Sequence, residues 1–274
     1  MRADAAGDRE LIEPLTALVS EAAAAILAIA PGELAPQAKA DESPVTRADR
    51  ASQAVILAGL ARLLPHLPVV AEEDEHRGCV ADAFVLVDPL DGTRDFLAGR
   101  DEFTVNVALV RHGTPVLGVV AAPALGLVWR GLAGAGAERL RLAPGAAPRR
   151  AEAVVPVRTR AWPRQPVVTV SRSHFDAATA AFVAGLGPLQ PLPCGSSVKF
   201  CRIAEGAADL YPRLAPTFEW DVAAGHAVLA AAGGRVETPA GGSLVYGARA
   251  PDFRIPAFVA WGDPQAPARR RPRP

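Results

Sequence analysis

Cysteine is scarce in this sequence of 274 residues, which contains only Cys79, Cys194 and Cys201. Three is an odd number and too few for a disulfide framework, and no two of these cysteines form the CxxC pair typical of a zinc site. We therefore expect reduced thiols, as in a cytoplasmic protein.

An excess of charge of either sign is also lacking, because 29 Lys and Arg residues are balanced by 29 Asp and Glu residues. General binders of nucleic acid or of membrane surfaces carry a clear positive excess, so neither class is expected. An anionic substrate would have to be held by local charges or by bound metal. Lysine is the rarest of the charged residues, with Lys39 and Lys199 alone in an arginine-rich chain.

No hydrophobic run is long enough to span a bilayer. The longest, residues 115–129, is broken by Pro123 and by several glycines. The charged residues before the first apolar stretch are unlike a signal peptide; they are Asp4, Asp8, Arg9 and Glu10. With 50% hydrophobic and 21% charged residues, the chain is expected to be soluble and to form one large domain or two smaller ones.

Apolar periodicity predicts an α/β chain in two halves. Helices are expected at residues 10–30, 49–64, 177–186, 198–206 and 221–232. Strands are expected at residues 69–71, 83–87, 104–110, 116–122, 166–170, 208–213 and 258–261, and at Val236 and Val245. Residues 144–166 lack a clear period and are interpreted as a junction. The predicted units are an N-terminal half, residues 1–150, a C-terminal half, residues 165–264, and a disordered basic tail, residues 265–274.

Two carboxylates, Asp88 and Asp91, follow the apolar strand predicted at residues 83–87. Ionised carboxylates this close repel each other unless a cation lies between them. Hard divalent cations such as Mg²⁺ prefer oxygen ligands of this kind. An Asp-Pro turn followed by a helix cap at Asp91 explains the same residues without metal, and the stretch alone favours neither reading.

The residues next to these two acids could add ligands of other kinds. The Leu90 carbonyl is available to a metal, and the backbone N–H groups of Gly92 and Thr93 would form a cradle for phosphate.

Other acids lie at predicted strand ends and helix starts. Glu72 and Glu73 end one strand, Asp49 opens one helix, and Asp221 opens another. Acids scattered in this way suit a multi-metal oxygen cage, whereas acids on a solvated helix face recur at helical spacing. Taken alone, Asp221 is better explained as an acid in a favourable position at the N-terminus of the helix dipole.

Together these motifs resemble the inositol monophosphatase superfamily of Mg²⁺-dependent, lithium-sensitive phosphatases, from about residue 10 to residue 262. The motifs are Glu72-Glu73, Asp88-Pro-Leu-Asp-Gly-Thr93, Trp220-Asp221-Val-Ala-Ala224 and Ala232-Gly233-Gly234. Further stretches resemble the CysQ-type 3'(2'),5'-bisphosphate nucleotidases within that superfamily. They are Ser43-Pro-Val-Thr-Arg-Ala-Asp49, Glu102-Phe-Thr-Val-Asn106, Ser171-Arg-Ser-His174, Gly195-Ser-Ser-Val-Lys-Phe-Cys201, Glu205-Gly-Ala-Ala-Asp-Leu-Tyr-Pro-Arg213 and Gly225-His226.

The resemblance implies a layered αβαβα sandwich of the inositol monophosphatase and fructose-1,6-bisphosphatase type. It also implies two Mg²⁺ ions, and a weaker third, at one active site. The first ion would be held by Glu72, Asp88 and the Leu90 carbonyl, and the second by Asp88, Asp91 and Asp221. Catalysis would involve Glu72 and Thr93, which would activate the attacking water, and Asp49, which would act through water at the third site.

The resemblance also implies how substrate is held. The phosphate to be cleaved would contact Leu90, Asp91, Gly92, Thr93 and Asp221. A second phosphate would be received by Ser196, Lys199 and Arg213, where a lysine point charge and an arginine fork suit a terminal phosphate. The alternative for Lys199 is a surface lysine whose stem lies along a helix.

The expected reaction is therefore hydrolysis of the 3'-phosphate of adenosine 3',5'-bisphosphate to AMP, which clears a by-product of sulfate activation. 3'-Phosphoadenosine 5'-phosphosulfate is a second expected substrate. The alternatives are an inositol or sugar phosphatase with the same metals, and a catalytically dead metal-binding regulatory protein. Expected partners are small molecules only, without nucleic acid. A monomer or a homodimer, and a peripheral position on the cytoplasmic face of the inner membrane, are both compatible with the sequence.

Overall fold

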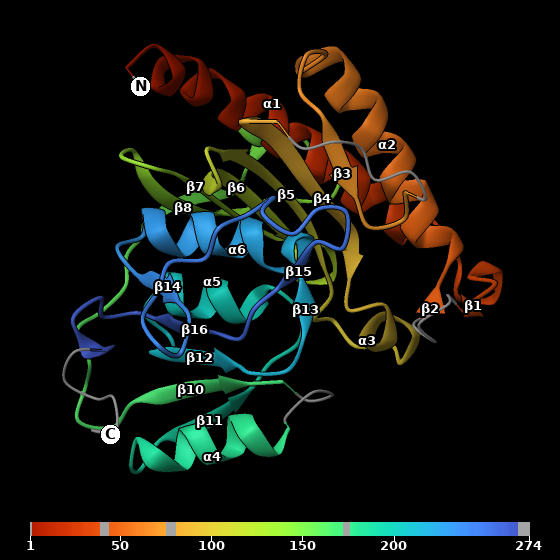
Figure 1. The fold of residues 1–274 in the computed structure, drawn as a ribbon. Helices are drawn as coiled ribbons and strands as arrows, with labels where there is room; N and C mark the ends of the chain where they lie inside the picture. Colours follow the sequence, from red (N-terminus) through yellow and green to blue (C-terminus); the bar gives the residue numbers. More distant parts are fainter. Residues whose placement is uncertain (1, 39–43, 75–80, 172–175, 268–274) are drawn as a thin grey trace.

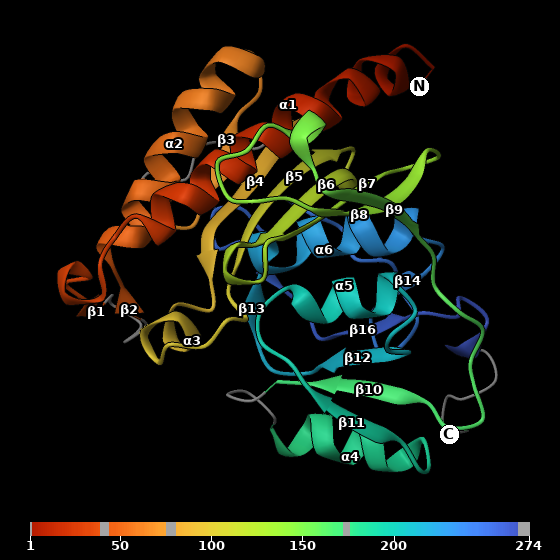
Figure 2. The ribbon, with the colours of Figure 1, turned by 180° about the vertical axis from the view of Figure 1, so that it is seen from behind.

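Helices and sheets alternate in five layers (Figures 1 and 2). The structure is a computed structural model, and it describes residues 2–38, 44–74, 81–171 and 176–267. Helices α1 (Arg2–Leu27) and α2 (Arg47–Leu63) cover one face of a seven-stranded sheet. Helices α5 (Val198–Ala204) and α6 (Glu219–Ala231) lie between this sheet and a five-stranded one, whose far side is covered by α4 (Ala177–Gly185). The predicted αβαβα arrangement is confirmed.

The larger sheet has the strand order β3-β4-β5-β6-β7-β8-β9 and is antiparallel except between β3 and β4. Its strands are β3 (Val69–Ala71), β4 (Ala83–Asp91), β5 (Thr104–Arg111), β6 (Thr114–Ala122), β7 (Leu127–Leu132), β8 (Gly136–Arg141) and β9 (Ala153–Val157). The β5–β6 hairpin turns at His112 and Gly113, which both have positive φ. Two such residues form the tight turn whose twist suits a hairpin, so the predicted hairpin is confirmed.

The smaller sheet has the order β11-β10-β12-β16-β14. Its strands are β10 (Val167–Val170), β11 (Gln190–Pro193), β12 (Leu210–Arg213), β14 (Arg235–Glu237) and β16 (Phe258–Trp261). Short elements complete the described chain: the 3-10 turns Pro31–Glu33, Pro123–Leu125 and Pro148–Arg150, the helix α3 (Thr93–Leu97), and the strands β1 (Gln37–Ala38), β2 (Pro44–Val45), β13 (Thr217–Phe218) and β15 (Arg254–Ile255).

Buried apolar side chains of the described residues form three clusters, one at each main junction between layers. The first joins α1 and α2 to one face of the larger sheet. The second joins the opposite face to α5, α6 and the smaller sheet. The third lies between the smaller sheet and α4. Because the two sheets share the middle cluster, α5 and α6 are fixed from both sides.

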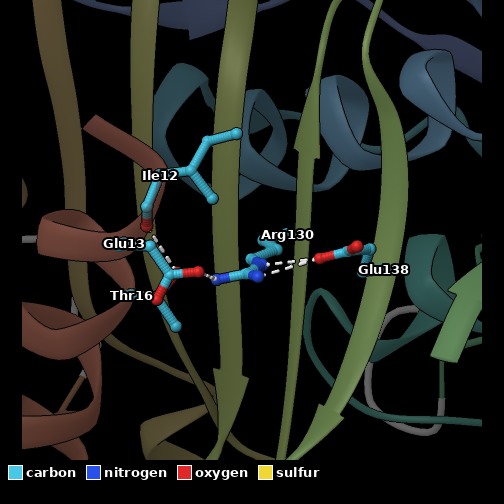
Figure 3. Close-up of polar contacts among 5 residues, drawn as sticks. All are labelled: Ile12, Glu13, Thr16, Arg130 and Glu138. Carbon is cyan, nitrogen blue, oxygen red and sulfur yellow. Dashed lines mark hydrogen bonds and ion pairs between the residues drawn. The ribbon is translucent and has the colours of Figure 1, made fainter. Parts of the chain in front are cut away.

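Arg130 of strand β7 links helix α1 to the outer strands of the larger sheet (Figure 3). Its guanidinium donates to Glu13 of α1 at 2.6 Å and, through two nitrogens, to Glu138 of β8 at 2.9 and 3.0 Å. Arg130 and Glu138 are direct cross-strand partners, so sheet register alone brings them together. On the same helix, the Thr16 hydroxyl donates to the backbone carbonyl of Ile12, which lies one turn earlier.

Helix α6 lies very close to the larger sheet because β6 and β7 carry glycine at the contact. A Cβ atom at Gly118 would stand 2.3 Å from the backbone oxygen of Ala224, and one at Gly131 would stand 2.7 Å from Cα of Val228. Since α6 carries Asp221, this contact also sets the depth at which that acid sits.

Gly118→Ala is therefore expected to destabilise the protein by about 2 kcal/mol, because the helix backbone must move away from the new methyl group. Urea denaturation measures the change. Gly7→Ala is the matched control: this helical glycine has nothing within 4 Å of its Cβ position, so alanine should stabilise by up to about 1 kcal/mol. Equal stability of Gly118→Ala and the unmodified protein would contradict the close approach.

Several predicted elements differ from the structure. Strand β4 runs on through Asp91, whereas residues 83–87 were predicted, and α1 begins eight residues before the predicted start at residue 10. Strands β7, β8 and β11 were not predicted, and the supposed junction contains β9. The strand predicted at Val245 is wrong, because this residue lies outside any strand and is exposed. Most of the predicted tail, residues 268–274, lies outside the described residues.

Among the residues that the structure describes, no helix is both long enough and apolar enough to cross a membrane.

Candidate active site

A cavity of about 330 Å³ lies where the two halves meet, and all but one of the predicted site residues line it. Strands β3 and β4 of the larger sheet and the residues that follow them contribute Glu72, Asp88, Leu90, Asp91, Gly92 and Thr93. The C-terminal half contributes Ser196, Lys199, Arg213 and Asp221. The exception is Asp49.

Asp88 and Asp91 reach the same cavity because strand β4 carries one extra residue between them. Positions three apart in a regular strand point to opposite faces. Asp88 pairs with Asn106 and Asp91 pairs with Thr104, so three steps on β4 match two steps on β5. Such a bulge reverses the alternation, and it tolerates Pro89, which has no N–H for the ladder.

The turn after Asp91 depends on Gly92. This residue has a φ of 91°, in the left-handed region that only glycine adopts without strain. Gly92 leads directly into α3. The residues on either side of it, Asp91 and Thr93, both line the cavity.

The acids of the cavity carry more negative charge than they can keep without a cation. Burial is the largest cause that raises the pKa of Asp88 well above its usual value, and the charges of Glu72, Asp91 and Asp221 raise it further. The pKa of Asp221 is also raised, first by burial and then by Asp91. A bound divalent cation would relieve both effects.

The chemistry of the donor set fits a hard divalent metal, because all the candidate ligands are oxygens and most are carboxylates. In the described part of the chain, no group of three Asp, Glu, His or Cys side chains is arranged so that it could already hold a metal ion. Two of the acids are instead held from one side by neighbouring donors.

Asp91 and Asp221 are held in the same manner, each through Oδ2. Oδ2 of Asp91 accepts hydrogen bonds from the Ser196 hydroxyl at 2.5 Å and the Ser197 N–H at 2.8 Å. Oδ2 of Asp221 accepts from the Thr217 hydroxyl and, at 3.1 Å, from the Phe218 N–H. Each carboxylate is thereby oriented through one oxygen.

Asp49 lies behind the cavity and is fully buried. It is the third residue of α2, not the first as predicted, and its Oδ2 accepts from the Thr46 N–H at 2.7 Å and the Thr46 hydroxyl at 2.6 Å. Its Oδ1 lies 3.1 Å from the Thr93 hydroxyl. Burial is the main cause that raises its pKa. Asp49 therefore reaches the cavity through Thr93, and its role at a third metal stays a prediction.

Asp221 shows the same relation to its helix. Helix α6 begins at Glu219, so Asp221 is its third residue and not the first as predicted. A carboxylate at the third position can accept the N–H of the residue before the helix, as Asp221 does with Phe218.

Two cations face the acids across the cavity. Lys199 is only 3% exposed, so the alternative of a surface lysine is wrong. Its ammonium lies 3.5 Å from the Cys194 carbonyl and 5.2 Å from the centre of the Tyr211 ring. Arg213 ends strand β12 and donates through Nη2 to the Pro216 carbonyl at 3.3 Å. Its Nε is buried and has no hydrogen-bond partner among the described residues.

Ser196 lines the cavity, but its hydroxyl is engaged by the protein. It donates to Asp91 and lies 2.6 Å from the Thr104 hydroxyl. Its predicted contact with a second phosphate stays a prediction.

Sequence reasoning missed Thr217 and Ser197, which contact Asp221 and Asp91. A threonine four residues before the acid of a helix start was the available signal for Thr217. No local signal identifies Ser197, because its partners lie 24 and 106 residues away in the sequence.

Comparison with known proteins identifies the family of the chain. Residues 8–257 match the model of the inositol monophosphatase family. The 3'(2'),5'-bisphosphate nucleotidase CysQ of Escherichia coli K12 is 44% identical over 228 residues, which are 80% of this chain and 88% of that protein. The protein of the same name from Buchnera aphidicola is 35% identical over 219 residues, 76% of each chain.

Solved structures indicate the same family. CysQ from Bacteroides thetaiotaomicron, described as a bacterial member of the inositol monophosphatase family, superposes with a TM-score of 0.76 at 33% identity, covering 93% of this chain and 97% of that one. An inositol monophosphatase from Anabaena shares the fold, with a TM-score of 0.70 at 24% identity and coverage of 95% and 93%. From sequence and structure alike, the chain belongs to the inositol monophosphatase family.

Proposed function

We propose that this protein is a Mg²⁺-dependent 3'(2'),5'-bisphosphate nucleotidase that converts adenosine 3',5'-bisphosphate to AMP and phosphate. 3'-Phosphoadenosine 5'-phosphosulfate would be a second substrate of the same site. Members of the family are metal-dependent phosphatases, and the relatives at 44% and 35% identity carry the name of this activity.

One observation carries the proposal: a single cavity has acids on one side and, on the other, two cations that form no direct ion pair with any described residue. Among the described residues, neither Lys199 nor Arg213 forms a salt bridge, although Lys199 is buried and Arg213 is half-buried. Burying positive charge without a partner is costly unless an anion arrives. A substrate with two phosphate groups would satisfy both sides of the cavity at once.

The acid side would bind the phosphate that is cleaved. Two Mg²⁺ ions, with a weaker third, would neutralise charge on the transferring phosphoryl group and lower the pKa of the attacking water. Glu72, Asp88, Asp91, Asp221 and the Leu90 carbonyl would hold them. Glu72 would take the proton of the attacking water on its carboxylate. Thr93, oriented by Asp49 at 3.1 Å, would position that water through its hydroxyl.

The cation side would bind the second phosphate and so select the substrate. Arg213 would offer its free Nε–H together with Nη2 as a fork, and Lys199 a point charge, to the terminal oxygens. In this division of labour, residues 1–150 supply most metal ligands, and residues 165–264 supply Asp221 and the selectivity residues.

The test is a comparison of substrates with purified protein and Mg²⁺. Phosphate release from adenosine 3',5'-bisphosphate should be at least about a hundredfold more efficient, in kcat/KM, than from inositol 1-phosphate or fructose 1,6-bisphosphate. Adenosine 3'-monophosphate is the matched control, because it lacks only the second phosphate. Preference for inositol or fructose phosphates would identify an inositol or sugar phosphatase instead. No turnover of any of them would favour a regulatory protein.

A further inference from the structure

Strand β5 presents polar side chains at alternate positions to a single loop of the other half. Glu102 lies two residues before the first residue of the strand, Thr104, and Asn106 lies within the strand. Residues two apart in an extended chain share a face. Phe103 and Val105, on the opposite face, pack in the cluster beneath α1 and α2. The polar face is therefore distinct from the core of the sheet.

The three polar side chains contact three successive residues of the chain, Gly195, Ser196 and Ser197, here called the serine loop. The Gly195 N–H donates to Glu102 Oε2 at 3.0 Å. The hydroxyl oxygens of Thr104 and Ser196 are 2.6 Å apart, and Asn106 Nδ2 donates to the Ser197 hydroxyl at 3.1 Å. Each of the three polar side chains thus forms a hydrogen bond with one residue of the serine loop.

The serine loop in turn holds Asp91. The single hydroxyl hydrogen of Ser196 is directed to Asp91 Oδ2 at 2.5 Å, so Thr104 must donate to Ser196. The Ser197 N–H gives Oδ2 a second hydrogen bond at 2.8 Å. The Ser197 hydroxyl also lies 2.9 Å from the backbone carbonyl of Asp221. One short loop therefore connects the two acids of different halves.

Two features of this arrangement oppose stability, and a third restricts the residue that the loop can carry. Ser196 has a φ of 52°, a conformation that a non-glycine residue adopts only with strain. A Cβ atom at Gly195 would stand 2.6 Å from the Glu102 carbonyl oxygen, so no other residue fits there. Oδ1 of Asn106 is buried without a hydrogen-bond partner among the described residues. Strain and unpaired polar atoms of this kind are retained where position matters more than stability.

We propose that Asn106, Ser196 and Ser197 are positioning residues for metal binding. They fix Oδ2 of Asp91 from the side of the smaller sheet, which turns the other carboxylate oxygen toward the cavity. The inference rests on the proposed function in one respect, that Asp91 is a metal ligand.

Mg²⁺ binding without substrate, measured by isothermal titration calorimetry, tests this directly. Loss of a group that orients a metal ligand typically weakens metal binding tenfold or more. We expect the Kd for Mg²⁺ to rise about tenfold in Ser196→Ala and at least about threefold in Asn106→Leu. Ser20→Ala is the matched control, since this buried hydroxyl of α1 donates only to the backbone at Ala143 and Ala146, none of which lines the cavity. Its Kd should be unchanged.

Thermal unfolding separates positioning from a structural role. Asn106→Leu removes the unpaired Oδ1 in a near-isosteric change, so the apo protein should unfold at the same or a higher temperature. A lower unfolding temperature with a Kd within twofold of the unmodified protein, in both Ser196→Ala and Asn106→Leu, would overturn the proposal. If Ser196→Ala does not fold, Asn106→Leu alone decides. Unchanged Mg²⁺ binding in Asp91→Asn would instead overturn the metal assignment, and with it this inference.

Discussion

Asp91→Asn is expected to lower kcat by at least about a thousandfold while the protein remains folded. The amide oxygen can accept the hydrogen bonds that Ser196 and Ser197 now give to Oδ2, which leaves the amide NH₂ facing the cavity. A donor there repels a cation. Bound metal supplies several kcal/mol of transition-state stabilisation, and a loss of about 4 kcal/mol corresponds to about a thousandfold in rate. Phosphate release at saturating Mg²⁺ measures the effect.

The same substitution should not destabilise the metal-free protein. The pKa values of Asp88 and Asp221 are raised first by burial, and the charge of Asp91 adds to that effect. Removing this charge relieves repulsion, so the unfolding temperature should stay the same or rise.

Asp209→Asn is the control with the opposite pattern. This buried acid accepts two hydrogen bonds from Arg160, at 2.7 and 2.8 Å, and one from the Val167 N–H. Replacing this carboxylate by an amide should lower the free energy of unfolding by about 2 kcal/mol and leave kcat unchanged. Appreciable turnover in Asp91→Asn would count against its assignment as a metal ligand.

Lys199→Ala and Arg213→Ala are each expected to raise KM for adenosine 3',5'-bisphosphate about thirtyfold, or about 2 kcal/mol. For adenosine 3'-monophosphate, kcat/KM should change by no more than about twofold, because this substrate has no phosphate on the cation side. The measurement compares the effect of each substitution on the bisphosphate with its effect on the monophosphate. Equal losses on both substrates would mean that the two residues are structural.

Stability provides a second discrimination for Lys199. Its ammonium is buried and has no carboxylate partner among the described residues, so alanine should not lower the unfolding temperature of the free protein. Arg202→Ala is the matched control on the same helix: Arg202 pairs with Glu205 at 2.6 Å, away from the residues that line the cavity. Arg202→Ala should have the same KM and kcat/KM as the unmodified protein for both substrates.

Local pattern predicts the elements whose apolar stretches are clearly bounded by turn or cap residues. The hairpin of β5 and β6, helix α4 and helix α5 lie close to their predicted positions, because signals such as the His112-Gly113 turn and the cap Asp176 mark where these stretches begin or end. Strand β9 was missed for the opposite reason. It is the edge of the larger sheet, and Val154 and Val155 are exposed there beside Pro156, so its residues show no alternation.

The site acids could be predicted from sequence, but the contacts that orient them could not. The position of Asp91 depends on a strained serine loop more than a hundred residues away. The extension of β4 through Pro89 was also unpredictable locally, because proline normally argues against a strand interior and is tolerated here only by the bulge.

That bulge makes the active site sensitive to chain length as well as to composition. Asp88 and Asp91 share the cavity because an odd number of steps on β4 is matched to an even number on β5. Deleting either Pro89 or Leu90 would remove the bulge and leave the acids two apart on one face, opposite the same two residues of β5. Inserting a residue while the bulge persists would instead change the parity and turn one acid to the α1 side of the sheet. An insertion between the two acids is therefore expected to separate them even where every side chain is kept.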